Sequence, residues 1–172
     1  ADGGPLLRAY LEGAARHAPA GLVSYVVAGP LLPAAERAAV ETLAAGLDGV
    51  HLVPFDPDFL AVAAAADVLV GMGGYNSLSE AAFLRKRAVV VPRVPGPEEQ
   101  IIRARRFEEL GLATMVAPAE LDGDRLWRAV AAELANPAPT APGLDFGGTE
   151  RIVDELVEAI ERGAADGRRR EG

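Results

Sequence analysis

Short apolar runs alternate with longer amphipathic segments along most of the chain. Each run has four to seven residues, nearly all Val, Leu or Ala, and polar residues do not alternate with them. Uninterrupted apolar runs of this length are typical of parallel strands that are buried on both faces. The pattern predicts strands at residues 22–28, 50–54, 68–71, 88–91 and 113–116.

The segments between these runs have the apolar spacing of helices. Several of them begin with a proline near the first turn, where the missing N–H costs nothing, and Gly111 stands where a glycine commonly ends a helix. We expect helices at residues 5–17, 33–47, 57–65, 76–84, 98–110, 119–134 and 149–162, and a proline-rich link at 136–143. This alternation predicts an α/β fold, namely a Rossmann-like open parallel sheet with helices on both faces.

The length and composition fit one domain. The chain has 172 residues, of which 50% are hydrophobic and only 5% aromatic, and this is enough for a core of its own. We expect the domain to cover residues 1–162 and residues 163–172 to form a frayed, charged tail. Three consecutive arginines at 168–170 fit a phosphate or membrane patch, but we interpret them as part of the solvated tail.

The composition also excludes several classes of protein. Without cysteine the chain has no disulfide, no thiolate metal site and no thiol nucleophile. A net charge of −8 argues against nucleic acid as a partner, because phosphate backbones bind to basic surfaces. No run approaches the ~20 apolar residues of a transmembrane segment, and no secretory signal is evident. We therefore expect a cytoplasmic protein, any membrane contact being peripheral and made through the full-length protein.

A Gly-Gly turn follows the predicted strand at 68–71. Gly73-Gly74 lets the backbone approach a ligand, and the helix that follows offers free N–H groups and a positive dipole end to a phosphate. Asn76 or Ser77 also fits as the cap of that helix, and Ser77 with Glu80 in the first turn has capping-box spacing. These residues alone leave a phosphate site and a purely structural turn equally open.

Four loops are expected at one edge of the sheet. Open α/β sheets bind ligands beyond the carboxyl ends of their strands, where the Gly-Gly turn lies together with Gly29-Pro30, Phe55-Asp56 and the loop at 92–97. Residues 98–100, which are Glu-Glu-Gln, follow that last loop. Their side chains suit the hydroxyls of a sugar, and they equally suit the acid-rich first turn of a helix.

Other residues of possible chemical importance have a plainer interpretation. Asp56 and Asp58 match the Asp-x-Asp motif of metal-binding loops, but they precede a predicted helix. We therefore interpret them as helix-start residues and expect no metal. His17 and His51 are isolated, and we expect structural or surface roles for them. No Gly-x-Gly-x-x-Gly motif follows a strand, which argues against a dinucleotide dehydrogenase.

One stretch of the sequence resembles a known family. Within residues 66–100 the chain has Ala-Asp-Val-Leu-Val, then Gly-Gly-x-Asn-Ser-x-x-Glu, then Val-Val-Val-Pro-Arg, then Glu-Glu-Gln. This order is similar to the C-terminal, donor-binding domain of family 28 glycosyltransferases of the GT-B fold, which include the MurG-type N-acetylglucosaminyltransferases. The likeness is greatest to bacterial proteins known only as predicted glycosyltransferases. It covers residues 22–121 well and the ends more loosely.

The resemblance implies a function and a set of binding residues. Members of the family transfer a sugar from a nucleotide-diphosphate sugar to an acceptor hydroxyl with inversion, and the resemblance implies no metal or other cofactor. The turn that holds the diphosphate matches Gly73, Gly74, Asn76 and Ser77. The acid that binds the ribose hydroxyls matches Glu80.

The remaining donor-binding positions also follow from the resemblance. Glu99 and Gln100 match the residues that bind hydroxyls of the donor sugar, and Phe55 matches the segment that packs on the base. Gly29 and Pro30 fall where a second loop approaches the phosphates. The run at 56–59 departs from the MurG-type pattern, so the base stays open among uracil, guanine and thymine.

The resemblance further implies parts that lie outside this chain. In the family a central strand leads into a glycine-rich loop that Gly3 and Gly4 resemble, so we expect the chain to lack the first strand of the sheet. The N-terminal acceptor-binding domain and its catalytic base are also expected outside it. We therefore expect no catalytic residue in this chain and no activity of the chain by itself.

Two alternatives remain. One is an enzyme like the nucleotide-sugar 2-epimerases, and the other is a non-catalytic nucleotide-sugar-binding subunit that needs a partner chain.

Overall fold

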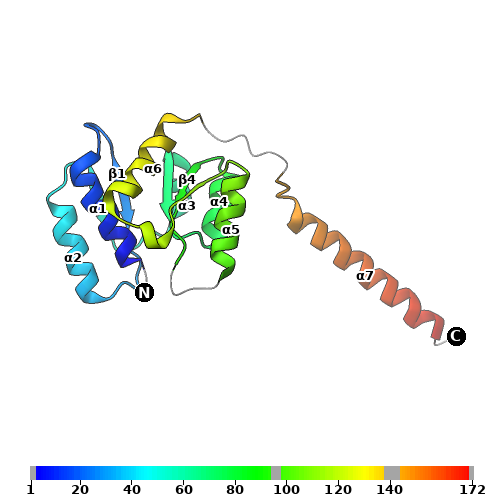
Figure 1. The fold of residues 1–172 in the computed structure, drawn as a ribbon. Helices are drawn as coiled ribbons and strands as arrows, with labels where there is room; N and C mark the ends of the chain where they lie inside the picture. The colour runs from blue at the N-terminus through cyan, green and yellow to red at the C-terminus, as the bar shows by residue number, and fades with distance from the viewer. Residues whose placement is uncertain (1–2, 94–97, 138–143, 171–172) are drawn as a thin grey trace. The chain divides into compact units, whose positions relative to one another are not determined.

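The computed structural model describes residues 3–93, 98–137 and 144–170, with the backbone alone for residues 161 and 163–170 (Figure 1). The chain divides into two compact units, unit 1 with residues 1–141 and unit 2 with residues 142–172. The expected proline-rich link falls largely outside the described residues.

Helices and strands alternate through unit 1 in the predicted order. They are α1 (Gly4–His17), β1 (Ser24–Val27), α2 (Ala34–Ala45), β2 (Val50–Val53), α3 (Phe59–Ala65), β3 (Val68–Gly71), α4 (Tyr75–Phe83), β4 (Arg87–Val90), α5 (Glu98–Glu109), β5 (Thr114–Met115), the 3-10 turn η1 (Pro118–Glu120) and α6 (Gly123–Ala135). All five predicted strands are present and all are parallel to their neighbours, which confirms the α/β prediction.

The strands form two hydrogen-bonded sheets instead of one continuous sheet. β1 pairs with β2, and β3, β4 and β5 form the second sheet in that order. This break agrees with the expectation that the chain lacks a central strand, and the predicted parallel α/β arrangement with helices on both faces is confirmed. The physical reason is a missing neighbouring strand. The central strand that we expect to be absent belongs between β1 and β3, and the described residues supply no strand there.

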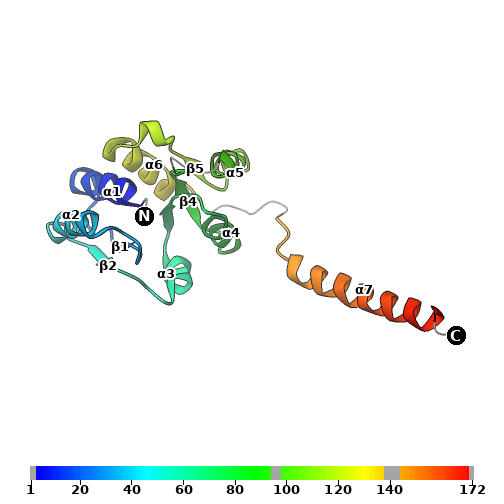
Figure 2. The ribbon, with the colours of Figure 1, turned by 90° about the horizontal axis from the view of Figure 1, so that it is seen from below.

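Helices cover both faces of the three-stranded sheet (Figure 2). α6 contacts β3 and β4 from one face, and α1 packs on α6 on the same side. α4 contacts β4 and α5 contacts β5 from the other face. This arrangement leaves the carboxyl ends of the strands at one edge, next to the beginning of α4.

α1 joins the two sheets. Ala9 lies in a buried cluster with Val89 of β4, whereas Leu11 is buried in a second cluster with Val40 of α2. The half-buried Tyr10 side chain packs against both clusters. Because no backbone ladder connects the sheets, this apolar burial holds them together.

A pair of glycines lets α1 and α6 approach closely. A Cβ at Gly13 would lie 2.1 Å from Cδ1 of Trp127 and 2.5 Å from the carbonyl oxygen of Gly123. Trp127 is 1% exposed, and its indole N–H donates to the carbonyl oxygen of Tyr10 at 2.7 Å. The indole therefore occupies the space that a side chain at Gly13 would need.

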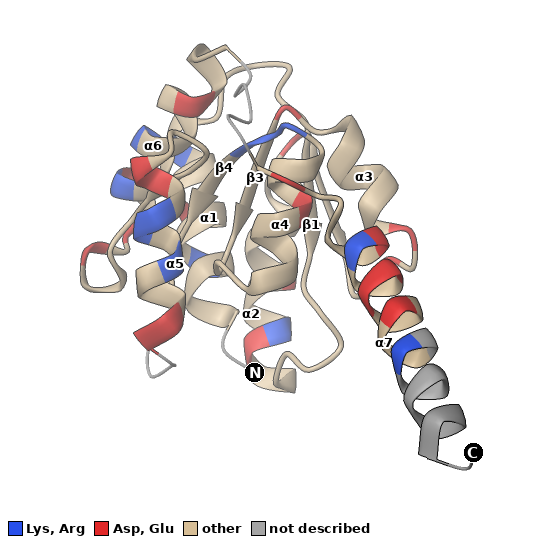
Figure 3. Ribbon diagram, turned by 90° about the vertical axis from the view of Figure 1, so that its right-hand side faces the viewer, with Lys and Arg blue, Asp and Glu red and all other residues tan. Residues whose placement is uncertain are grey.

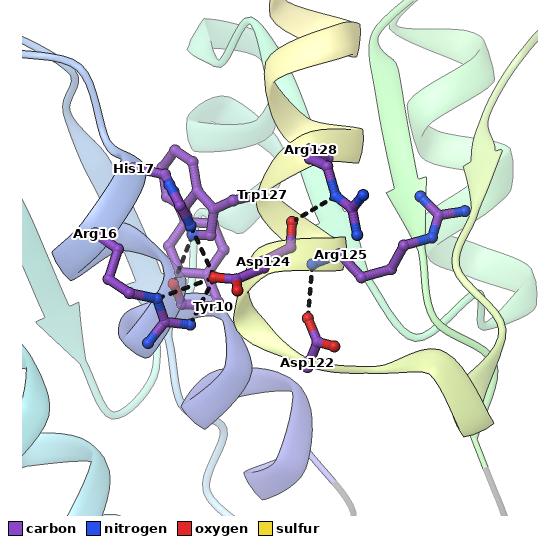
Figure 4. Close-up of polar contacts among 8 residues, drawn as sticks. All are labelled: Tyr10, Arg16, His17, Asp122, Asp124, Arg125, Trp127 and Arg128. Atoms are coloured by element: carbon purple, nitrogen blue, oxygen red, sulfur yellow. Dashed lines mark hydrogen bonds and ion pairs between the residues drawn. The ribbon is translucent and has the colours of Figure 1, made fainter.

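Polar contacts close the same interface at its surface (Figure 4). Asp124 of α6 accepts hydrogen bonds from Nε2 of His17 at 2.8 Å and from Nε of Arg16 at 3.0 Å. The bond from His17, followed by that from Arg16, lowers the pKa of Asp124 below its ordinary value of 3.8. His17 thus has the structural surface role that the sequence predicts.

A buried carboxylate ties the end of α6 to the three-stranded sheet. Glu133 is 5% exposed, and its Oε2 lies 3.3 Å from Nη1 of Arg87. Its Oε1 accepts a hydrogen bond from the hydroxyl of Thr114, and Arg87 also donates to the carbonyl oxygen of Pro137. A charge that is taken out of water needs such partners, because its lost solvation is otherwise uncompensated.

Two helices begin at least two residues later than predicted. α3 begins at Phe59 instead of 57, with Asp58 as its N-cap. α6 begins at Gly123 instead of 119, because the Asp122 side chain accepts the N–H of Arg125 at 2.7 Å and fixes the N-cap there.

The single helix of unit 2 is longer than predicted and amphipathic. α7 (Gly148–Arg170) continues past the expected end at 162 through the stretch expected to fray. No proline interrupts residues 163–170, and two alanines favour the helix. Its exposed apolar side chains are Ile152, Val153, Leu156, Val157 and Ile160. Acidic residues prevail among the charges on its described part (Figure 3). Within the residues that the structure describes, no helix is both long and apolar enough to span a membrane.

We expect Gly13→Ala to destabilise the protein by roughly 1–3 kcal/mol, because the added methyl group has no room beside Trp127 and Gly123. Helix propensity alone predicts that the substitution raises the free energy of unfolding by up to about 1 kcal/mol. Urea unfolding followed by circular dichroism measures whether this free energy falls or rises. Gly46→Ala is the matched control, since Gly46 has a φ of −92° and an added Cβ lies 3.9 Å from its nearest neighbour, the carbonyl oxygen of Leu43. A Gly13→Ala protein as stable as this control contradicts the close contact.

The contacts of Asp124 predict a contribution to stability that acid removes. Because the folded-state pKa lies below 3.8, the contribution is complete above that value and disappears as the pH falls through the folded pKa. Asp124→Asn should therefore have a lower melting temperature than the wild type at about pH 6, and this difference should shrink as the pH falls through the folded-state pKa of Asp124. The exposed Asp48→Asn is the control. If the melting temperatures of the wild type and Asp124→Asn still differ by the same amount in strong acid, the Asp124 carboxylate does not make this contribution to stability.

Candidate functional site

The turns that follow β3 and β4 lie side by side at the carboxyl edge of the three-stranded sheet. β3 pairs in parallel with β4, with Gly71 opposite Val90, so both strands end at the same edge. The first turn of α1 reaches the same edge. A small cavity of about 130 Å³ there is lined by Pro5, Leu6, Met72, Val91, Pro92, Arg93, Pro118 and Leu121.

The turn after β3 requires glycine at its first position. Gly73 is buried with a φ of +72°, and a Cβ there would lie 2.6 Å from Cγ1 of Val90. Both the backbone conformation and the contact exclude a side chain. Gly74 then serves as the N-cap of α4, with φ −59° and ψ 153°.

The structure corrects the predicted capping of α4. The helix begins at Tyr75, and no side chain caps it. With Gly74 as N-cap, Asn76 and Ser77 stand inside the first turn, and Glu80 falls in the second turn instead of the first. The capping-box alternative for Ser77 and Glu80 is therefore wrong, because the glycine moves the start of the helix ahead of both.

The first turn of α4 is open to solvent. The side chains of Tyr75, Asn76 and Ser77 are exposed. The first backbone hydrogen bond of the helix runs from the N–H of Leu78 to the carbonyl oxygen of Gly74 at 3.1 Å. The three preceding N–H groups have no partner within a helix of this geometry. Together with the positive end of the helix dipole, they form a site suited to an anion. Glu80 is half-buried one turn further along.

The first turn of α5 lies next to that of α4. Gln100 accepts the backbone N–H of Arg93 through its Oε1 at 3.2 Å, which fixes both ends of the β4–α5 loop. Glu99 is 71% exposed and forms an ion pair with Arg103. The guanidinium carbon of Arg103 lies 5.4 Å from the ring centroid of Tyr75, a cation–π contact between the two helices. The proline-containing part of the loop, residues 94–97, falls outside the described residues.

Sequence reasoning missed Tyr75 and Arg103. A signal for Arg103 exists in the pattern: it shares the inward stripe of α5 with Gln100, Ala104 and Phe107, where an apolar residue is usual. Tyr75 carries no comparable signal, because an aromatic residue after two glycines also fits a surface turn.

The loops that follow the two-stranded sheet form a separate group. Gly29 has a φ of +84°, and Nη2 of Arg37 lies 3.4 Å from its carbonyl oxygen. Pro30 is exposed, and Phe55 is 60% exposed. A cleft of about 200 Å³ beside these loops is lined by Ala28, Arg37, Val40, Glu41, Leu52 and Pro54.

A strand residue anchors the loop that carries Phe55. The hydroxyl of Tyr25 donates to Oδ2 of Asp56 at 2.5 Å, and Oδ1 of Asp56 accepts the N–H of Asp58 at 2.8 Å. The Tyr25 bond, followed by the bond from the Asp58 backbone, lowers the pKa of Asp56, and the same bond to Asp56 raises the pKa of Tyr25. Asp56 therefore stabilises the loop and is not part of the helix start, whereas Asp58 is the N-cap residue of α3.

The structure thus brings together one part of the expected site and leaves another on the other sheet. Gly73, Gly74, Asn76, Ser77, Glu99 and Gln100 surround the adjoining starts of α4 and α5. Gly29, Pro30 and Phe55 follow the two-stranded sheet. In the described part of the chain, no group of three or more His, Asp or Glu side chains is placed to hold a metal ion. His51 is exposed on β2.

Comparisons with known proteins agree with this geometry. Residues 33–143 match the family described as the glycosyltransferase family 28 C-terminal domain. A UDP-N-acetylglucosamine--N-acetylmuramyl-(pentapeptide) pyrophosphoryl-undecaprenol N-acetylglucosamine transferase of Methylobacterium radiotolerans is 30% identical over 129 residues, which are 70% of this chain and 35% of the relative. An uncharacterized glycosyltransferase of Methanopyrus kandleri is 32% identical over 115 residues, 66% of this chain and 33% of the relative.

A solved structure shows the same fold. The glycosyltransferase VinC in complex with DTDP superposes with a TM-score of 0.59 at 22% identity, over 76% of this chain and 30% of VinC. This chain spans about a third of the length of the curated relatives it matches. Since the family match covers most of unit 1, the chain belongs to the family of glycosyltransferase family 28 C-terminal domains.

Proposed function

We propose that the chain is the donor-binding half of an inverting glycosyltransferase, which takes a sugar from a nucleotide-diphosphate sugar. The observation that supports this most is the Gly73-Gly74 turn, whose helix starts with open N–H groups beside the Glu99-Gln100 turn of α5. An anion site and a group of hydroxyl-binding side chains thus adjoin each other at the carboxyl edge of a parallel sheet.

We assign the parts of the donor to the residues accordingly. The diphosphate binds at Gly73, Gly74, Asn76 and Ser77, and Glu80 accepts hydrogen bonds from the ribose hydroxyls. Glu99 and Gln100 bind hydroxyls of the sugar. Gly29 and Pro30 approach the phosphates from the other sheet, and the exposed Phe55 packs on the base.

The proposed reaction needs groups from both halves of the full-length protein. The bond from the anomeric carbon to the diphosphate oxygen breaks as the acceptor oxygen forms its bond from the opposite side. The acceptor proton passes to a base in the N-terminal domain. The negative charge that develops on the diphosphate meets the amino end of α4, without a metal.

We propose that the protein acts in the cytoplasm, next to the membrane. The support is the relative from Methylobacterium radiotolerans, whose acceptor carries undecaprenol, a long apolar chain. On this proposal the acceptor is bound by the N-terminal domain.

The first test is nucleotide binding by the 172-residue chain. Isothermal titration with UDP, GDP and dTDP should show one of them binding with a dissociation constant in the millimolar range or tighter, because the open N–H groups of α4 are ready to receive the diphosphate. Bovine serum albumin under the same conditions controls for nonspecific heats. If none of the three nucleotides binds at millimolar concentration, the assignment of the site fails.

Glu80 can be tested through the ribose. A hydrogen bond to a charged group contributes about 1.5–3 kcal/mol, so the chain should prefer the ribonucleotide to its 2′-deoxy counterpart by roughly tenfold or more. Glu80→Ala should bind both equally. Glu109→Ala, which removes an exposed acid that pairs with Arg106 at the far end of α5, should keep the preference. A preference that survives in Glu80→Ala assigns the ribose contact to another residue.

A further inference from the structure

Arg103 stands where a helix normally places an apolar side chain. It lies on the stripe of α5 that also carries Gln100, Ala104 and Phe107, at spacings of three and four residues. Ala104 is completely buried and Phe107 packs against the core cluster around Val90. Arg103 itself is only 18% exposed. An arginine that is held this close to a core requires partners for its charge.

The structure gives Arg103 two partners, and both belong to the start of the candidate site. Its guanidinium carbon lies 5.4 Å from the ring centroid of Tyr75, the first residue of α4. The same guanidinium pairs with Glu99 in the first turn of α5. The cation therefore lies between the first turns of the two helices, beside the Gly73-Gly74 turn.

These partners leave part of the guanidinium for a ligand. Its planar fork has five N–H donors, and one carboxylate uses at most two of them in a bidentate pair. Tyr75 contacts the face of the cation and takes none of the N–H groups. The Arg103 side chain keeps 18% of its surface exposed, and its partners Tyr75 and Glu99 are 67% and 71% exposed.

Arg93 follows β4 and lines the cavity at the same edge, whereas two further described cations near the three-stranded sheet pair away from this edge. Arg87 lies at the amino end of β4 and pairs with Glu133. Arg106 pairs with Glu109 one turn further along α5 and is 67% exposed. In a chain with a net charge of −8, a cation at the mouth of an anion site has a large effect on whether a dianion is bound.

We propose that Arg103 binds the diphosphate of the donor, together with the amino end of α4, and that Glu99 and Tyr75 hold its guanidinium in place. This inference rests on the proposed function, since it names a further ligand of the same site. The helix terminus supplies partial charges, and Arg103 supplies a full charge and a bidentate fork for phosphate oxygens. Glu99 then has two tasks, orienting Arg103 with one oxygen and facing the sugar with the other.

The test compares a nucleoside diphosphate with its nucleoside on the 172-residue chain. The pairs are UDP with uridine, GDP with guanosine and dTDP with thymidine, and the pair whose diphosphate binds most tightly is used. Arg103→Met keeps the length and the apolar stem of the side chain but removes the charge. It should weaken binding of the diphosphate at least tenfold and leave the nucleoside unchanged. Arg103→Lys keeps the charge without the fork and should give an intermediate loss.

Arg106→Met is the matched control, since it removes an arginine from the same helix one turn away, and it should bind the diphosphate like the wild type. Circular dichroism melting of each variant shows whether it is folded. The proposal is overturned if Arg103→Met loses affinity equally for the diphosphate and the nucleoside, or if it loses no affinity at all. Arg103 is then only a contact between α4 and α5. A wild-type chain that binds neither compound overturns the proposed function as well, so the two failures are distinguishable.

Discussion

The close contact between α1 and α6 is the constraint on which the rest of unit 1 depends. The two sheets share no hydrogen-bonded ladder, and α1 is the helix that packs in the cores of both. Its position is set where Gly13 meets Gly123 and Trp127 fills the remaining space. Because α6 packs in turn on β3 and β4, this contact decides how the loops after the two-stranded sheet stand relative to the start of α4.

The candidate site shows how an acidic chain can receive an anion. Charges of both signs occur along α5 and α6 (Figure 3), and the chain has a net charge of −8, so its overall charge does not attract a phosphate. The positive potential is instead local. It comes from backbone N–H groups that a buried glycine turn exposes, and from one arginine held between an aromatic ring and a carboxylate. Local charge of this kind acts over a short range and is selective for a ligand whose shape brings its anion there.

Most elements of the fold could be predicted from the sequence, because buried parallel strands and amphipathic helices have distinct patterns. β3 matches its predicted range at both ends, and α1 begins one residue early. The position of the break follows from the resemblance, which implies a missing central strand, whereas a strand's own residues do not report which neighbour is present. The predicted cap of α4 is wrong because Asn76 and Ser77 are good capping residues, whereas Gly74 takes the N-cap position ahead of both. The motif residues of the candidate site can be read from the sequence, whereas the contact of Tyr75 with Arg103 exists only in three dimensions.

The split sheet has a consequence for the physical behaviour of the chain. β1 and β3 each pair on one side only, so each has a free row of backbone N–H and C=O groups about four residues long. Such rows attract any extended polypeptide, including another copy of the same chain. Solutions of this chain are therefore subject to edge-to-edge association that grows with concentration. A strand that pairs with both β1 and β3 would complete the sheet and would also prevent this association.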